Sequence, residues 1–327
     1  MDASIRWGIL GTGYVSDRFA GELREVDGAA LVAVASRSGD RARNFAERHG
    51  AQRAHKGYEA LAADGGIDAV YIGTPHSLHR EHTVICLRAG KHVLCEKPLA
   101  INAAQAEEMA GTARETGLLL MEAMWTRFLP ALGEVRRLVA EGEIGEVRRI
   151  ESDFGFRAEP DGAPRLFDPA LGGGALLDLG VYGISLAHLL LGRPDHVGGT
   201  ARIGTTGVDE DSYVVLGYKN GAEAIARASI AAASPCEAVV IGTLGRIRMH
   251  APWYGAERIT VSRARRADET IDLPLRGSGF AHEIEAFMEC IRDGRQETDA
   301  MPLGDSLAVM RTMDEARRLW DLRYPME

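Results

Sequence analysis

The first 122 residues alternate short apolar runs with longer stretches in which apolar residues recur at helical spacing. This alternation is typical of strands that are each followed by a helix and that assemble into a parallel sheet with helices on both faces. The expected strands lie at residues 5–10, 30–35, around 54, 69–72, 92–95 and 118–121. The expected helices between them lie at residues 40–49, 58–63, 78–89 and 102–115.

The pattern changes after about residue 122, where β-rich runs begin to follow one another without helices between them. Such runs predict a largely antiparallel sheet. The elements expected here are a helix at 130–141, a strand at 147–156, a glycine-marked helix, strands between 197 and 262, and helices at 281–293 and 303–322. We therefore expect an α/β protein of two domains: a doubly wound parallel sheet over 1–122 and an α+β domain with a large, mostly antiparallel open sheet over 123–327.

The first expected strand runs directly into Gly11-Thr12-Gly13-Tyr14-Val15-Ser16. A strand, a glycine turn and a helix in this order form the dinucleotide-binding fingerprint of Rossmann domains. Gly11 would make the tight turn, and Gly13 would let backbone N–H groups approach a pyrophosphate at the helix N-terminus. Ser16 replaces the third glycine, and its small side chain suits that position. We expect residues 11–15 to contact the cofactor.

The second expected strand ends in Ser36-Arg37-Ser38, with no acid to hold the ribose 2′-hydroxyl of NAD. Arg37 can pair with a 2′-phosphate, which favours NADP over NAD, and Ser36 and Arg41 would assist. The alternative is that Arg37, Arg41 and Arg43 form only a solvated basic helix start.

Lys97 follows the apolar strand at 92–95 within Gly90-Lys91-His92-Val93-Leu94-Cys95-Glu96-Lys97-Pro98. Ligands of an open parallel sheet bind at the carboxyl ends of its strands, so Lys97 would stand at the mouth of a crevice. Taken alone, Glu96-Lys97-Pro98 is an ordinary surface turn.

A second group of chemically able side chains follows the glycine run 172–174. If this run opens a helix, Asp178 and Tyr182 are four residues apart and share one face. Gly180 and Gly183 would lie on another stripe and allow close packing against a sheet. The alternative is that Asp178 caps its own helix and Tyr182 belongs to the core. Together with Lys97, however, the two residues make a set that can handle protons.

Composition limits the partners of the protein. The chain has 327 residues and a formal net charge of −9, which argues against nucleic acid as a general partner. Its apolar runs fall short of the roughly 20 residues that cross a bilayer, so we expect no membrane partner and no signal peptide. The four cysteines show no paired spacing, and we expect a reduced, cytoplasmic setting.

His76, His79 and His82 recur every three residues but do not indicate a metal site. At that spacing His76 and His82 would stand about 240° apart around a helix. We therefore expect no metal.

Taken together, these motifs resemble the glucose-fructose oxidoreductase and inositol dehydrogenase family. The resemblance rests on the glycine turn, Thr74-Pro75, His79, Gly90-Lys91-His92, Glu96-Lys97-Pro98 and the segment that contains Asp178. Within the family, residues 122–130 and Tyr182 look most like the dimeric dihydrodiol dehydrogenases and their NADP-linked sugar dehydrogenase relatives. Many members have histidine where this chain has Tyr182, which argues against imidazole as the base. The resemblance implies that the cofactor is also contacted by Thr74, Pro75, His76, His79, Glu96 and Lys97.

The resemblance further implies hydride transfer between nicotinamide C4 and a carbinol carbon. Lys97 would stabilise the developing alkoxide, and Tyr182 would accept the proton because a nearby ammonium favours tyrosinate. Asp178 would orient Lys97. Alternatively, Lys97 is the base and Tyr182 only positions the substrate.

Aromatic and arginine side chains are the candidates for the substrate pocket. Aromatic side chains form the apolar walls of small-molecule sites, and tryptophan stacks on sugar rings. For the aromatic residues the alternative is core packing, and for the arginines it is surface pairing. The candidates are Trp125, Arg127, Phe154, Arg165, Trp253 and Phe280.

Two classes of function fit these observations. One is an enzyme that oxidises a vicinal diol or a sugar, or reduces the matching carbonyl compound. The other is a catalytically silent, NADP-binding redox sensor. Because Lys97, Asp178 and Tyr182 are all present, the enzyme is favoured. We also expect a homodimer or homotetramer that associates through the second-domain sheet.

Overall fold

A computed structural model describes residues 4–327 of the chain. The chain forms two compact units. The first unit comprises the chain up to Ala100, Ala104–Trp125 and Arg276–Ser306, and the second comprises Ile101–Ala103, Thr126–Leu275 and Leu307–Glu327.

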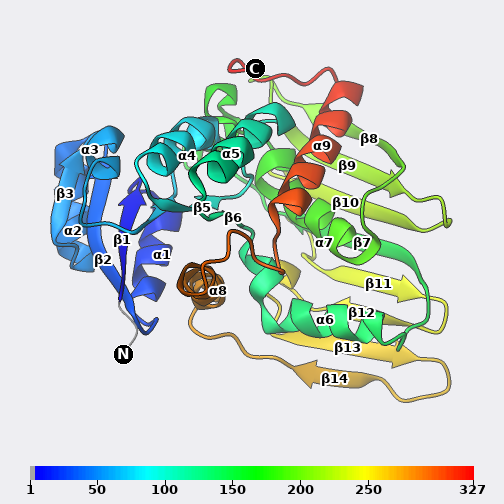
Figure 1. Ribbon diagram of the computed structural model, residues 1–327. Coiled ribbons are helices and arrows are strands. Elements are labelled where there is room, and N and C mark those ends of the chain that lie inside the picture. The colour runs from blue at the N-terminus through cyan, green and yellow to red at the C-terminus, as the bar shows by residue number, and fades with distance from the viewer. Residues whose placement is uncertain (1–3) are drawn as a thin grey trace. The chain divides into compact units, whose positions relative to one another are not determined.

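The first unit contains a six-stranded parallel sheet in the order β3-β2-β1-β4-β5-β6 (Figure 1). This order places a topological switch point between β1 and β4, where open parallel sheets bind ligands. The strands are β1 (Ile5–Leu10), β2 (Ala29–Ser36), β3 (Arg53–Lys56), β4 (Ala69–Ile72), β5 (His92–Glu96) and β6 (Leu120–Ala123).

Helices follow the strands of this unit as the apolar spacing predicts. They are α1 (Tyr14–Leu23), α2 (Gly39–His49), α3 (Tyr58–Ala62), α4 (His79–Arg88) and α5 (Ala103–Thr116), with a 3₁₀ turn η1 (His76–Leu78) before α4. The helix α8 (Phe280–Arg292) also belongs to this unit, although it follows the second sheet in the sequence. Phe287 of α8 lies 5.1 Å from Trp7 of β1, centroid to centroid, and Trp7 also contacts Phe19 of α1. The core of the first unit is therefore completed by residues that are remote in sequence.

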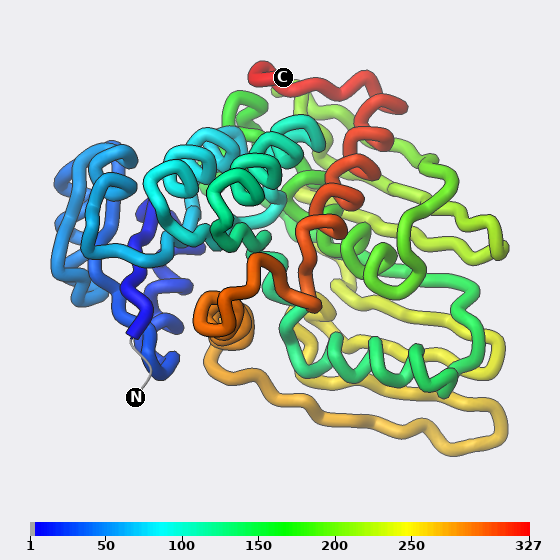
Figure 2. Tube along the Cα trace, in the orientation of Figure 1, coloured from blue at the N-terminus to red at the C-terminus, as the bar shows by residue number. Residues whose placement is uncertain are grey.

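The second unit contains an eight-stranded sheet in the order β14-β13-β12-β11-β7-β10-β9-β8. Only the pair β7 and β10 is parallel among its described pairings. The yellow to orange strands β11 to β14 form successive antiparallel neighbours in Figure 2. The strands are β7 (Val147–Gly155), β8 (His196–Ile203), β9 (Asp209–Gly217), β10 (Glu223–Ser229), β11 (Ala238–Gly242), β12 (Gly245–Met249), β13 (Arg258–Arg263) and β14 (Glu269–Asp272).

Helices α6 (Pro130–Ala140), α7 (Val181–Leu191) and most of α9 (Leu303–Leu319) belong to the same unit. Figure 1 shows them on one side of the sheet. The remaining short elements are η2 (Trp125–Phe128), η3 (Pro164–Phe167), η4 (Pro169–Leu171), η5 (Leu176–Gly180) and η6 (Trp253–Gly255). The predicted α/β class, with a parallel and a mostly antiparallel sheet, is confirmed.

The segment Pro169–Leu191 is long and apolar enough to cross a membrane by length and composition alone, contrary to the sequence-based expectation. However, 83% of its most apolar window is buried inside the protein. The sequence pattern underestimated this run because glycines and Asp178 interrupt it. Burial of this kind is what the core helix of a globular domain shows.

Candidate active site

The glycine turn after β1 has the backbone geometry that a dinucleotide requires. Gly11 has a φ of +99°, and a Cβ there would stand 2.6 Å from the carbonyl oxygen of Gly73. Only glycine fits such a position without strain. A Cβ on Gly13, by contrast, would meet none of the described atoms within 4 Å, so the backbone here is open to a ligand. Gly13 is also the N-cap of α1 and supplies no side-chain cap, which leaves backbone N–H groups of the first turn for an anion.

Two further residues of this turn, Ser16 and Tyr14, differ in burial. Ser16 is fully buried, and its hydroxyl lies 3.5 Å from the Gly73 carbonyl, as a small third residue of the fingerprint requires. Tyr14 is 76% exposed. The turn therefore fits a dinucleotide pyrophosphate.

The carboxyl ends of β2 and β3 border a cavity of about 530 Å³. Ser36 pairs with Lys56 in the sheet, and Ser38 caps α2 by accepting a hydrogen bond from the Arg41 amide. The residues that line the cavity are Arg37, Lys56, Gly57, Tyr58, Glu59, Leu78, Glu81 and His82. Two cations, Arg37 and Lys56, thus stand beside the start of α2, where an anion is favoured.

Tyr58 links the cationic and the aromatic sides of this cavity. Its phenol interacts with Arg37, and its ring lies 4.2 Å from that of His82, centroid to centroid. Burial lowers the pKa of His82 to about 4, so this ring is neutral near pH 7. Sequence reasoning missed Lys56, Tyr58 and His82. The register that sets Ser36 opposite Lys56 is a feature of the folded sheet, so spacing along the chain carried no signal for these residues.

His79 supports the loops near Lys97. Its ring is fully buried between two backbone carbonyls, with Nδ1 2.9 Å from the Pro98 oxygen and Nε2 2.9 Å from the Thr74 oxygen. Burial, with the neighbouring His76, lowers its pKa to about 3. His79 therefore connects the loop after β4 to the residue that follows Lys97. Among residues 4–327, no group of three potential metal-ligating side chains occurs.

Lys97 directly follows β5, and the acid before it is firmly held. Glu96 accepts a hydrogen bond of 2.5 Å from the Tyr71 hydroxyl and one of 3.2 Å from the Lys97 amide. Tyr71 stacks on Phe19 with 3.7 Å between ring centroids. The lysine therefore extends from a backbone that is fixed by a buried, hydrogen-bonded acid, as a catalytic side chain requires.

Glu283 of α8 is a second buried acid in the first unit. It has no exposed surface, and among the described residues neither of its carboxyl oxygens has a hydrogen-bond partner. Burial, followed by the charge of Glu96, raises its pKa well above the usual range and so favours the neutral form of this carboxyl. No motif pointed to Glu283, because α8 joins this unit from more than 150 residues downstream of β6.

Asp178 and Tyr182 lie on the glycine-led helical segment of the second unit, and both are buried. Asp178 Oδ1 accepts a hydrogen bond of 2.9 Å from Arg165 Nη2. Tyr182 lies 5.5 Å from Phe154 and 5.9 Å from Tyr254, centroid to centroid. An acid, an arginine and three aromatic rings are thus gathered in one place.

The glycine stripe beside these residues packs as predicted. A Cβ on Gly183 would stand 2.5 Å from Ser152 Oγ and 2.8 Å from Ala226 Cβ, so the helix approaches the sheet too closely for any side chain. The segment is not a plain α-helix, however, because η5 is a π-helix that carries Asp178. Such wide turns are frequent at functional sites and leave no signature in the spacing of apolar residues.

Three of the predicted substrate-pocket residues, Trp125, Trp253 and Arg127, make different kinds of contact. Trp125 stacks on Phe280 at 5.5 Å within the first unit. Trp253 is 2% exposed, its Nε1–H donates to the Asp153 carbonyl at 2.8 Å, and its ring lies edge-on to Tyr254, so its indole belongs to the core. Arg127 is also buried and donates to the hydroxyl and the carbonyl oxygen of Ser185, which ties η2 to α7. Trp253 and Arg127 therefore have a structural role in the second unit.

Comparison with known proteins identifies the two parts of the chain. Residues 5–124 match an oxidoreductase family with an NAD-binding Rossmann fold, and residues 132–248 match the GFO/IDH/MocA C-terminal domain. The chain is 36% identical to trans-1,2-dihydrobenzene-1,2-diol dehydrogenase of Xenopus tropicalis, over 98% of this chain and 99% of that protein. It is 34% identical to the enzyme of the same name from Homo sapiens, over 99% of both.

Solved structures give the same result. A 3-ketoreductase from Actinomadura kijaniata in complex with NADP and TDP-benzene is 32% identical, with a TM-score of 0.86 over 96% of this chain and 97% of that chain. An aldose-aldose oxidoreductase from Caulobacter crescentus complexed with glycerol is 26% identical, with a TM-score of 0.87 over the same shares. The chain therefore belongs to the GFO/IDH/MocA family of oxidoreductases.

Proposed function

We propose that this oxidoreductase uses NADP(H) to transfer hydride between nicotinamide C4 and a carbinol or carbonyl carbon of a vicinal diol or a sugar. The observation that carries the proposal is the buried acid–tyrosine pair Asp178 and Tyr182, set among Phe154, Tyr254 and Arg165. A protein that only senses the cofactor has no need for such a group. The substrates named for the similar enzymes, a dihydrodiol and sugar derivatives, support the substrate class.

The chemistry assigns a separate task to each side chain. When bound, NADP accepts the hydride that leaves the carbinol carbon. The hydroxyl must lose its proton as the hydride departs, and we assign Tyr182 as the acceptor of that proton. The ammonium of Lys97 stabilises the developing alkoxide, and the carbonyl forms as the C–H bond breaks. The alternative assignment makes Lys97 the base and Tyr182 a positioning group.

The preference for NADP over NAD is supported by the cavity at the ends of β2 and β3. Arg37 and Lys56 line it, and Ser36-Arg37-Ser38 offers no carboxylate to a ribose 2′-hydroxyl. A carboxylate at this position would repel a 2′-phosphate, whereas two cations attract it.

The sheet of the second unit is our candidate for self-association. Tyr213 and Val215 of β9 are two residues apart, so they lie on one face of the sheet, and they are 41% and 38% exposed. Apolar side chains exposed on one face favour burial against an identical face of a second copy. We propose a symmetric dimer or a dimer of dimers, to be checked by light scattering at micromolar concentration.

The function is tested by following nicotinamide absorbance at 340 nm. The purified protein is mixed with NADP or NAD and with a panel of trans-dihydrodiols and aldoses, and the reverse reaction is run with NADPH and keto sugars. We expect turnover on at least one member of the panel, with a lower KM for NADP than for NAD. Tight NADP binding without turnover in either direction would instead favour the redox sensor.

A further inference from the structure

We propose that Asp209 and Tyr324 are positioning residues that grip the glycine turn Gly172–Gly174 and so fix the orientation of Asp178 and Tyr182. The inference rests on the proposed function of Asp178 and Tyr182. Neither Asp209 nor Tyr324 belongs to a motif that the sequence marks as functional.

Asp209, the first residue of β9, holds the start of the irregular helix. It has no exposed surface, and its Oδ2 accepts a hydrogen bond of 2.6 Å from the amide of Leu176, the first residue of η5. Gly174 has a φ of +113°, and a Cβ there would stand 2.3 Å from Asp209 Oδ1. The acid therefore replaces the side-chain cap that a helix start ordinarily supplies for itself.

Tyr324 holds the same turn from the segment that follows α9. Its hydroxyl donates to the Gly173 carbonyl at 2.7 Å and lies 3.1 Å from the position of a Cβ on Gly174. The ring is 3% exposed, and the Arg317 guanidinium lies 5.2 Å from its centroid. Arg317 in turn donates to Glu327, which accepts a hydrogen bond of 2.9 Å from the Tyr324 amide. The contacts with Gly173, Arg317 and Glu327 thus hold the Tyr324 phenol in place.

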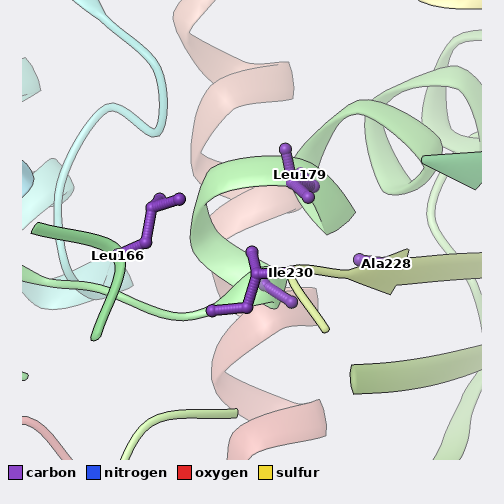
Figure 3. Close-up of a cluster of buried hydrophobic side chains, with 5 residues drawn as sticks. Leu166, Leu179, Ala228 and Ile230 are labelled. Atoms are coloured by element: carbon purple, nitrogen blue, oxygen red, sulfur yellow. The ribbon is translucent and has the colours of Figure 1, made fainter. Parts of the chain in front are cut away.

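The start of the irregular helix contains one long backbone hydrogen bond, and Asp209 and Tyr324 add contacts to it from outside the helix. The Asp178 amide reaches the Gly174 carbonyl only at 3.4 Å. On the remaining side lies an apolar cluster, Leu166, Ala175, Leu179, Ala228 and Ile230. Figure 3 shows Leu166, Leu179, Ala228 and Ile230 gathered around this stretch of helix. Hydrogen bonds are directional, so Asp209 and Tyr324 add a constraint on the orientation of the helix to that of these apolar contacts.

Charge favours this arrangement when Tyr324 is protonated. Burial, with the nearby Asp209, raises the pKa of Tyr324 well above its usual range, so the phenol remains a donor. Burial also raises the pKa of Asp209 to about 7, against the opposing effects of the Leu176 amide, the Ser212 hydroxyl and Arg317. Both protonation states of Asp209 can accept from the Leu176 amide.

The test compares Tyr324→Phe with Tyr218→Phe. Both tyrosines donate a hydroxyl to a glycine carbonyl at an end of the same helical segment, Tyr324 to Gly173 and Tyr218 to Gly192. We expect Tyr324→Phe to lower kcat about tenfold or more while KM for NADP stays within about twofold, because small misplacements of reacting groups are costly. Tyr218→Phe should leave both constants near wild type. Equal kcat in the two variants would overturn the proposal.

Hydrogen exchange supplies a readout that does not depend on turnover. Tyr324→Phe and Asp209→Ala, which removes the acceptor of the Leu176 amide, should each increase exchange at the amides of residues 174–180, and Tyr218→Phe should not. If wild type turns over no substrate, the proposed function fails, yet this exchange difference still decides whether the grip exists. Unchanged exchange in both variants would refute it. If the variants unfold, the stability of Tyr324→Phe relative to Tyr218→Phe shows whether the loss is specific, and equal losses would also refute the proposal.

Discussion

The cofactor turn of the first unit and the acid–tyrosine helix of the second unit are built in different ways. The turn is made by backbone: Gly11 and Gly13 set its shape within a few residues of β1. The helix that carries Asp178 is held by side chains from β9 and from the segment after α9. A site made of local backbone can be recognised in a continuous motif, whereas a site held by distant side chains depends on the completed fold. Substitutions in the two regions should therefore fail differently.

The largest effect is expected from the side chains assigned to proton handling. Lys97→Ala and Tyr182→Phe should each lower kcat about a hundredfold to ten-thousandfold, because each removes a group that acts in the transition state. NADPH binding, followed by fluorescence titration, should remain. Near-normal kcat in Lys97→Ala would refute the assignment, and the larger loss of the two identifies the better candidate for the base.

A single added methyl group at Gly11 should distort the glycine turn after β1. Gly11→Ala places a Cβ 2.6 Å from the Gly73 carbonyl at a φ of +99°, which costs about 1–3 kcal/mol of strain and should displace the cofactor. We expect weaker NADPH binding in fluorescence titration and a lower Tm.

Gly21→Ala in α1 is the matched control for this change, since a Cβ there meets none of the described atoms within 4 Å. It should be neutral or stabilise by about 0.5–1 kcal/mol. Equal NADPH affinities in the two variants would argue against the pyrophosphate site.

A smaller and more selective effect is expected at the cationic cavity. Arg37→Ala and Lys56→Gln should each raise KM for NADP about tenfold or more and leave KM for NAD within about twofold, because a charge-assisted phosphate contact is worth roughly 1.5–3 kcal/mol. The measurement is steady-state kinetics with both cofactors. Arg43→Ala, which removes an exposed pair with Asp40 and does not change the lining of the cavity, is the control. Parallel changes with both cofactors would remove the 2′-phosphate assignment.

The smallest effect concerns pH and the second region. The folded-state pKa of Asp209 is raised from 3.8 to about 7, so its contribution to stability is full below pH 4 and is lost as the pH rises through 7. Asp209→Asn should therefore weaken the decline in Tm between pH 5 and pH 8, by about a few degrees. Thermal unfolding followed by circular dichroism across this range is the measurement. A variant with the same pH slope as wild type would contradict the assigned protonation.

Lys97 and Glu283 show which site positions could be predicted from the sequence and which could not. The position of Lys97 after a strand was predictable because strand pattern and motif occupy one continuous stretch. Glu283 is buried in the same unit, yet its helix precedes no strand and follows the whole second sheet. Likewise, the glycine stripe at Gly180 and Gly183 was predicted from spacing, but the π-helix η5 was not, since it depends on which carbonyls the amides reach.

The sequence by itself determined the order of strands and helices along the chain, the glycine turn and the position of Lys97 after a strand. It also determined that Asp178 and Tyr182 lie on one helical segment. Each depends on residues within a few positions of one another, where backbone preference and apolar period act directly. Only the tertiary structure decided that Lys56 joins Arg37, that Asp209 caps η5, and that Tyr324 reaches Gly173 from 151 residues away. The physical reason is that long-range hydrogen bonds are selected by packing after the chain has folded, and no local preference encodes them.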